Sequence, residues 1–234
     1  MSSPRSGDKE VVVPAGSMTV EDTYQVRESA ARTLLSLNPS CFGTILADPP
    51  WQFANRTGKM APEHKRLMRY RTMPLEEILE MPVARVAKRQ AHLYLWVPNA
   101  LLGEGLEVMK RWGFTYKTNI VWYKVRRDGG PDGRGVGFYF RNVTELVLFG
   151  ARNGLRTSQP GRRQVNLIPS QKREHSRKPD ELYDIIEACS PGPYLELFAR
   201  HARPGWHQWG DEMLENDEDE QRSLPLPHVS AISY

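Results

Sequence analysis

The sequence predicts an α/β fold in which a mostly parallel sheet carries helices on both faces. Short apolar segments that are rich in β-branched and aromatic residues alternate along the chain with segments of helical periodicity. With 234 residues, of which 39% are hydrophobic, the chain can bury one full core. We therefore expect a single domain over residues 17–212, with a disordered segment at 1–16 and an acidic, disordered tail at 213–234.

The first expected elements are a helical cap over residues 17–41 and a buried strand. Apolar residues between Val20 and Leu37 have approximately helical spacing, and Asn38-Pro39 would end that helix. The apolar run Phe42–Ala47 follows and stops at Asp48, because the next two residues are prolines, which cannot donate to a sheet. Asp48 is therefore expected where a buried strand ends, at the edge of the sheet where such folds bind ligands.

The middle and end of the chain repeat this alternation between long polar loops. A helix is expected from Thr72, a good N-cap, to Val86, with an interruption at Pro82. Residues 54–71, 126–141 and 152–177 are polar and basic, and we expect them to form surface loops. The remaining expected elements are strands at 92–97, 114–124, 143–149, 194–198 and 206–209, and helices at 101–112 and 179–189.

Charge is distributed unevenly along the chain. The net charge is +4, but residues 211–234 carry seven acidic side chains and one arginine, which leaves +10 on the rest. A basic body suits a polyanion such as nucleic acid, although basic surfaces are also common in proteins without such a partner.

Several classes of protein are disfavoured by composition. No run of eighteen apolar residues is present, and the N-terminal residues lack the apolar core of a signal peptide, so we expect a cytoplasmic protein that is neither secreted nor bound to a membrane. Cys41 and Cys189 are far apart and form no CxxC motif, which indicates neither a metal site nor a disulfide framework.

Asp48, Pro49, Pro50 and Trp51 are the candidate reaction centre. The carboxylate of Asp48 and the backbone carbonyl of Pro49 are acceptors that could hold the hydrogens of an amine such as adenine N6, and the prolines fix the backbone that aims them. Trp51 offers a flat face for stacking a base. The same four residues could also form a simple turn. Their position directly after an apolar strand favours the functional interpretation.

Short motifs in a fixed order span residues 42–212. They are Ala47-Asp48-Pro49-Pro50-Trp51, Tyr70-x-Thr72-Met73, Leu95-Trp96-Val97, Trp112-Gly113, Ile120-Val121-Trp122-x-Lys124, Glu145, Lys178-Pro179-Asp180-Glu181, Ser190-Pro191-Gly192, Glu196-Leu197-Phe198-x-Arg200 and Trp206–Gly210. In these motifs the chain resembles the N6-adenine methyltransferases typified by the catalytic subunit of the eukaryotic messenger-RNA adenosine methyltransferase. That family also has compact bacterial and phage members.

The resemblance implies a Rossmann-like fold that uses S-adenosyl-L-methionine, with the catalytic motif before the main cofactor strand. Asp48 to Trp51 would hold the target adenine, and Tyr70 and Glu145 would contact the substrate. The implied cofactor contacts are Asp48, Lys178, Glu196, Leu197, Phe198, Arg200, His201, Asp211 and Glu212. The chain departs from the eukaryotic pattern at two places: His201-Ala202-Arg203 replaces Pro-His-Asn, and Asp211-Glu212 replaces Asn-Gln.

The compact chain favours DNA as the substrate polymer, with methylation of RNA adenosine as the alternative. A third hypothesis, from another class, is a catalytically silent nucleic-acid-binding subunit. Basic side chains of the loops would contact phosphates, which position a nucleic acid without reading its sequence; these are Lys65, Arg66, Arg69, Arg71, Arg126 and Arg127. Because no separate recognition domain is evident, a homodimer or heterodimer is a further hypothesis.

Overall fold

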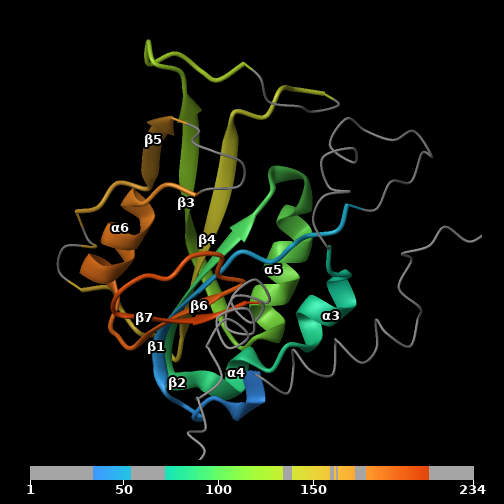
Figure 1. The fold of residues 1–234 in the computed structure, drawn as a ribbon, viewed down its shortest axis with the longest axis vertical. Coiled ribbons are helices and arrows are strands. Elements are labelled where there is room, and N and C mark those ends of the chain that lie inside the picture. Colours follow the sequence, from blue (N-terminus) through green and yellow to red (C-terminus); the bar gives the residue numbers. More distant parts are fainter. Residues whose placement is uncertain are drawn as a thin grey trace, which may run out of the picture.

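The computed structural model describes residues 34–53, 72–133, 139–158, 161, 163–171 and 178–210 (Figure 1). Within these residues, seven strands form one sheet in the order β5-β3-β4-β2-β1-β6-β7. The strands are β1 (Phe42–Ala47), β2 (Ala87–Val97), β3 (Thr115–Val125), β4 (Thr144–Arg152), β5 (Leu167–Gln171), β6 (Tyr194–Leu197) and β7 (Trp206–Trp209).

Strand direction confirms the mostly parallel sheet. β4 pairs antiparallel with β2 and β3, whereas β1 with β2, β1 with β6, β6 with β7 and β3 with β5 are parallel pairs. Six strands therefore end at the same edge of the sheet, and β4 begins there. We call this the C-terminal edge.

Helices cover both faces of the sheet, as expected. Side chains alternate along β1, so Ile45 and Ala47 face one side and Leu46 the other. The first side packs against α3 (Leu75–Glu80), α4 (Val83–Val86) and α5 (Leu102–Arg111), which follows the short 3-10 helix η1 (Asn99–Leu101). The second side packs against α6 (Glu181–Cys189), which lies across the sheet from α3 and α5 in Figure 1.

A glycine allows α5 to approach the sheet closely. A Cβ added at Gly150 on β4 would lie 2.7 Å from the Sδ of Met109, which is fully buried on α5. Such a distance is well below van der Waals contact, so this position requires the absence of a side chain.

The structure differs from the sequence predictions mainly in one surface segment and in the length of one strand. β5 lies within residues 152–177, which we had expected to be a loop, and β2 begins at Ala87 instead of His92. In β5 only Ile168 is buried, and Pro169 lies within the strand, so neither periodicity nor composition indicates a strand there.

The predictions for the two ends of the chain are tested only in part. Residues 34–36 are helical and the helix stops before Asn38, as expected for the end of the cap. The rest of the predicted cap, the segment 1–16 and the tail 213–234 lie outside the described residues, so the domain boundaries stay predictions.

Candidate active site

The chain reverses its direction of travel across the sheet between β1 and β6. From β1 the chain continues to β2 on one side, whereas from β6 it continues to β7 on the other. Open α/β sheets bind ligands at such a switch point, outside the carboxyl ends of the strands. Asp48 follows β1 and Phe198 follows β6, and the Asp48 N–H faces the Leu197 carbonyl at 3.5 Å. The predicted placement of Asp48 beside Glu196, Leu197 and Phe198 is confirmed.

Two hydrogen bonds, at Pro50 and at Trp51, hold the C-terminal end of the segment from Asp48 to Trp51. The Pro50 carbonyl accepts a hydrogen bond from the Met73 N–H at 2.8 Å, and the Trp51 indole N–H donates to the Trp96 carbonyl at 2.9 Å. The Trp51 side chain is only 6% exposed and packs in the core. Trp51 therefore anchors the segment, and its buried ring offers little surface for the base stacking expected from the sequence.

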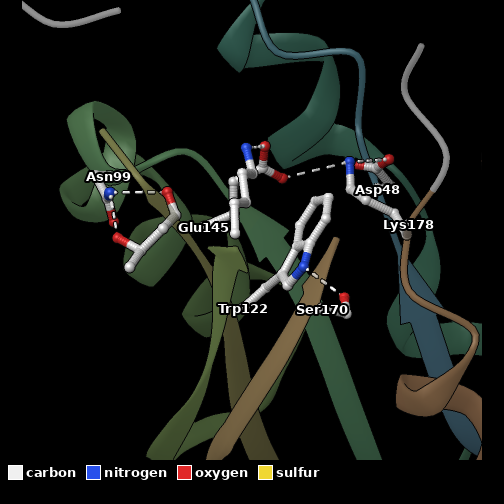
Figure 2. A network of polar contacts seen from close by, with 8 residues as sticks. Asp48, Asn99, Trp122, Glu145, Ser170 and Lys178 are labelled. Atoms are coloured by element: carbon white, nitrogen blue, oxygen red, sulfur yellow. Dashed lines mark hydrogen bonds and ion pairs between the residues drawn. The ribbon is translucent and has the colours of Figure 1, made fainter. Parts of the chain in front are cut away.

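Asp48 forms an ion pair with Lys178, which lies three residues before the start of α6. Lys178 Nζ donates to Asp48 Oδ2 at 2.7 Å and lies 3.7 Å from Glu145 Oε2 (Figure 2). Burial by itself would lower the pKa of Lys178, but the two carboxylates outweigh it and raise that pKa. Lys178 is therefore held in its charged form, and it joins the end of β1 to the start of β4.

Glu145 is held at the start of β4 by neighbours from two other elements. The side-chain amide of Asn99 in η1 donates to the carbonyl and the hydroxyl oxygen of Thr144, at 3.1 and 3.0 Å. Lys124, near the end of β3, contacts Glu145 Oε1. The sequence motif that includes Lys124 lies in the site, but its pairing with Glu145 was not predicted.

Glu196 is a buried carboxylate on the α6 side of the sheet. The Tyr183 hydroxyl donates to Glu196 Oε1 at 2.7 Å. Burial raises the pKa of the Glu196 carboxyl, and hydrogen bonding from Tyr183 and from Gln208 acts in the opposite direction. Among the described residues, Glu196 Oε2 is one of two buried side-chain atoms without a hydrogen-bond partner; the other is Trp209 Nε1. Such an acceptor is costly to leave unsatisfied, and it fits a hydroxyl group of a ligand.

Tyr183 is a site residue that sequence reasoning missed. The helix predicted from Pro179 was assigned an apolar inner face, and a tyrosine beside that face gave no separate signal. In the structure, its ring contacts Trp206 edge to face at 5.2 Å, and the Arg203 guanidinium lies 4.3 Å from the ring centroid. The sequence signal that could have identified Tyr183 is a hydrogen-bond donor on the helix that precedes the strand of Glu196.

The loop after β6 has a constrained backbone. Phe198 has a φ of 64°, in the left-handed region that non-glycine residues rarely adopt, and its ring meets Trp209 edge to face at 5.6 Å. A Cβ at Gly210 would lie 2.5 Å from the Ala199 carbonyl oxygen, so the end of β7 passes directly against this loop.

The other predicted cofactor residues differ in their surroundings. Arg200 is half-buried, near enough to Lys178 to lower its pKa by repulsion. Leu197 is fully buried in the core, so only its backbone reaches the C-terminal edge. The His201 side chain is exposed, and its carbonyl accepts a hydrogen bond from the Gln208 amide. Of the three, Arg200 is the side chain with direct electrostatic coupling to the site.

The predicted phosphate contacts are described only in part. Arg126 and Arg127 are exposed in the loop after β3, and Arg126 pairs with Asp128 at 2.8 Å. The remaining predicted residues lie outside the described residues: Lys65, Arg66, Arg69, Tyr70, Arg71, Asp211 and Glu212.

The described residues include neither a cluster of metal ligands nor a helix that could span a membrane. No group of three or more histidine, cysteine or acidic side chains is arranged there to hold a metal ion. Within the same part of the chain, each helix is too short or too polar to cross a bilayer.

Comparison with known proteins identifies the family. The family model MT-A70 matches residues 42–212, which include β1, the Asp48–Trp51 segment and every later strand. The chain belongs to the MT-A70 family. MT-A70 proteins are an S-adenosylmethionine-dependent methyltransferase family, and the mixed sheet of this member is consistent with their Rossmann-like fold.

Relatives of this MT-A70 protein come from plants, bacteria, fungi and animals. An MT-A70-like protein of Medicago truncatula is 33% identical over 74% of the chain and 26% of its own length. The type II methyltransferase M.MunI of Mycoplasma sp is 27% identical over 75% of the chain and 79% of its own length. The N6-methyladenosine RNA methyltransferase MTA1 of Cryphonectria parasitica is 28% identical over 91% of the chain and 62% of its own length. The chain thus spans about a quarter of the plant relative but most of M.MunI.

Proposed function

We propose that this MT-A70 protein transfers a methyl group from S-adenosylmethionine to the N6 amine of adenine in DNA. The observation that carries the proposal is the position of the Asp48 carboxylate, directly after β1 at the switch point of the sheet and beside the end of β6. Family membership supports the reaction class, and the geometry supports Asp48 as the group that faces both ligands.

The site has the groups that S-adenosylmethionine requires. Glu196 Oε2, which is buried and lacks a partner, suits a ribose hydroxyl. Arg200 would also contact the ribose and Phe198 would lie next to it, while Lys178 would contact the carboxylate of the cofactor or the substrate. When bound, the cofactor supplies an electrophilic methyl group on its sulfonium.

The acceptors at Asp48 and Pro49 would orient the amine of the target base. The lone pair of adenine N6 is delocalised into the ring, so the nitrogen must become more tetrahedral before it can attack. The Asp48 carboxylate would accept one N6 hydrogen. The Pro49 carbonyl already accepts the Trp51 N–H at 2.8 Å, and its second lone pair would accept the other. Fixed acceptors hold the nitrogen in line with the methyl group, and Asp48 can take the proton that the methylated amine loses.

DNA is our choice of polymer because the chain aligns with most of a type II methyltransferase. It covers 79% of M.MunI, whereas it covers 28% of the N(6)-adenosine-methyltransferase catalytic subunit METTL3 of Homo sapiens. Methylation of RNA is the second candidate, favoured by the fungal RNA methyltransferase that aligns with 91% of the chain. In duplex DNA the base would have to flip out, at a cost of a few kcal/mol, which a single strand avoids.

The test measures transfer from labelled S-adenosylmethionine to matched duplex DNA, single-stranded DNA and RNA, with the methylated nucleoside identified by mass spectrometry. We expect transfer to DNA, and its loss in Asp48→Asn with an unchanged circular dichroism spectrum. Asp184→Asn is the matched control, because Asp184 is an exposed aspartate on α6 whose ion pair with Arg203 is 3.5 Å long. Equal transfer by Asp48→Asn and the parent would refute the mechanism. Transfer to RNA alone would refute the choice of polymer, and binding of nucleic acid without transfer would favour the silent subunit.

A further inference from the structure

Four charged side chains of alternating sign form a chain along the C-terminal edge (Figure 2). Lys124 contacts Glu145 Oε1, Glu145 Oε2 lies 3.7 Å from Lys178 Nζ, and Lys178 Nζ donates to Asp48 Oδ2 at 2.7 Å. They come from the end of β3, the start of β4, the residue before Pro179 and the end of β1. The two cations and two anions sum to zero formal charge. The negative charge of each carboxylate is therefore offset to the extent that an ammonium lies close to it.

Asp48 has two competing roles in this arrangement. The proposed function requires its carboxylate to accept a hydrogen from the neutral amine of adenine, but Lys178 already donates to Oδ2. An ammonium forms hydrogen bonds to a carboxylate that are about twice as strong as those between neutral groups. Lys178 therefore weakens Asp48 as an acceptor for as long as it stays on that oxygen.

Glu145 offers Lys178 a second position. A movement of about 1 Å would turn the 3.7 Å contact with Glu145 Oε2 into a hydrogen bond. The Lys178 ammonium lies 5.0 Å from the centroid of the Trp96 ring, within the range of a cation–π interaction. Trp96 is almost fully buried, so its ring keeps its position while the ammonium moves over it from one carboxylate to the other.

Lys124 determines the orientation of the Glu145 carboxylate relative to the Trp96 ring. Its ammonium binds Oε1, which leaves Oε2 toward Lys178, and it lies 4.8 Å from the centroid of Trp122. The Trp122 indole N–H donates to Ser170 Oγ at 2.9 Å, and the Trp122 ring meets Trp96 edge to face at 5.9 Å. Each of the two lysine ammonium groups therefore lies over a tryptophan ring, and the two rings contact one another.

We propose that Lys124 is a positioning residue: by occupying Glu145 Oε1 it keeps Lys178 shared between Asp48 and Glu145, so that Lys178 passes to Glu145 only when the target amine enters. This inference rests on the proposed function. The exchange moves one ammonium between two carboxylates and breaks no covalent bond. Other charged or titratable groups around the site are Arg200, which repels Lys178, and Glu196 and Tyr183, which lie near Asp48.

The test compares Lys124→Met with Lys117→Met, which removes the same charge from an exposed position on the same strand. The first readout is the carbon-13 NMR spectrum of the Asp48 and Glu145 carboxyls, recorded at one fixed pH in the full chain without ligands. Loss of Lys124 removes the ammonium that competes for Glu145, so Lys178 should move from Asp48 toward Glu145. The carboxyl resonances of both residues should then shift from their positions in Lys117→Met. Lys124→Arg should restore both. A shift at Glu145 alone, with Asp48 as in Lys117→Met, would show that Lys178 is not shared and would overturn the proposal.

The second readout is the pH profile of methyl transfer. Redistribution of Lys178 between the two carboxylates should move the acid limb of kcat/KM by about half a pH unit or more in Lys124→Met relative to Lys117→Met. A purely structural role would lower Tm and leave this limb in place, which would contradict the proposal. If the parent methylates no adenine, the proposed function fails, and the NMR spectra still decide whether Lys178 is shared.

Discussion

Replacement of Tyr183 by phenylalanine tests the buried carboxylate at the centre of the proposed cofactor site. The change removes the hydroxyl that donates to Glu196 Oε1 at 2.7 Å, while the ring can keep its contacts with Trp206 and Arg203. A hydrogen bond to a charged group contributes about 1.5–3 kcal/mol. Because Glu196 Oε2 already lacks a hydrogen-bond partner, loss of the Tyr183 hydroxyl would weaken the hydrogen bonding of the carboxylate further, and we expect a destabilisation of about 2 kcal/mol.

The expected cost depends on pH. Burial raises the pKa of Glu196 above its ordinary value, and the donor from Tyr183 opposes that rise. Without the hydroxyl, the pKa of folded Glu196 should rise further, so the carboxyl binds a proton more readily in the folded variant. The destabilisation should therefore be largest well above the folded pKa, where the carboxylate is ionised, and should shrink as the pH falls through that pKa.

Urea denaturation of the parent and variant at pH 8 and pH 5 measures both effects. Tyr194→Phe is the matched control, because its ring also contacts Trp206 but its hydroxyl donates to the neutral Ser190 carbonyl at 3.0 Å. The control should cost about 1 kcal/mol at either pH. In calorimetric titrations, Tyr183→Phe should bind S-adenosylmethionine about tenfold more weakly, equivalent to about 1.4 kcal/mol. Equal costs for the two variants, independent of pH, would refute the role assigned to Tyr183.

Three further predictions concern the core and the anchored segment. Burial lowers the pKa of His92 below 6.5, so as the pH falls the unfolded chain binds a proton before the folded chain does. The free energy of unfolding of the parent should therefore fall as the pH drops below about 6.5. In urea denaturation, His92→Asn should make this free energy less dependent on pH. Gly150→Ala places a Cβ against Met109 and should cost about 1–3 kcal/mol by the same assay, with Gly103→Ala, where nothing lies within 4 Å, as a control expected to be neutral or stabilising. Trp51→Phe removes the N–H that donates to the Trp96 carbonyl and should cost about 1–3 kcal/mol, with a fall in methyl transfer at saturating substrate; unchanged stability would show that the indole is no anchor.

The strands and helices that could be predicted from the sequence are those with a strong local signal. The fully buried and mostly apolar run of β1 ends one residue before two prolines, and α5 has an amphipathic pattern with Gly113 beyond its end. β5 gave no such signal, since four of its five side chains are at least partly exposed and its pairing with β3 is set by tertiary structure. The start of β2 was missed because Lys88, Arg89 and Gln90 are polar and lie outside the core.

The candidate site could be predicted as a list of residues but not as a set of contacts. The motifs identified Asp48, Glu145 and Lys178, which are 97 and 33 positions apart in sequence. Their pairing depends on strand order, in which β1 and β4 both flank β2. The same limit applies to Trp51. An aromatic residue next to a catalytic motif indicates a stacking surface equally well whether its ring faces a ligand or, as here, the core.

The Asp48–Trp51 segment explains why a strand end can serve as an acceptor site. Asp48 is the last residue of the segment before Trp51 that has a backbone N–H, and this N–H is directed at the Leu197 carbonyl of β6. Pro49 and Pro50 have no N–H, so the chain cannot continue pairing and neither residue places a donor at the edge. Met73 takes the Pro50 carbonyl and the Trp51 indole is tied to β2, which fixes the chain beyond the prolines. The groups that remain at the edge are a carboxylate and a carbonyl, both acceptors, and an amine with two hydrogens is the ligand group that they complement.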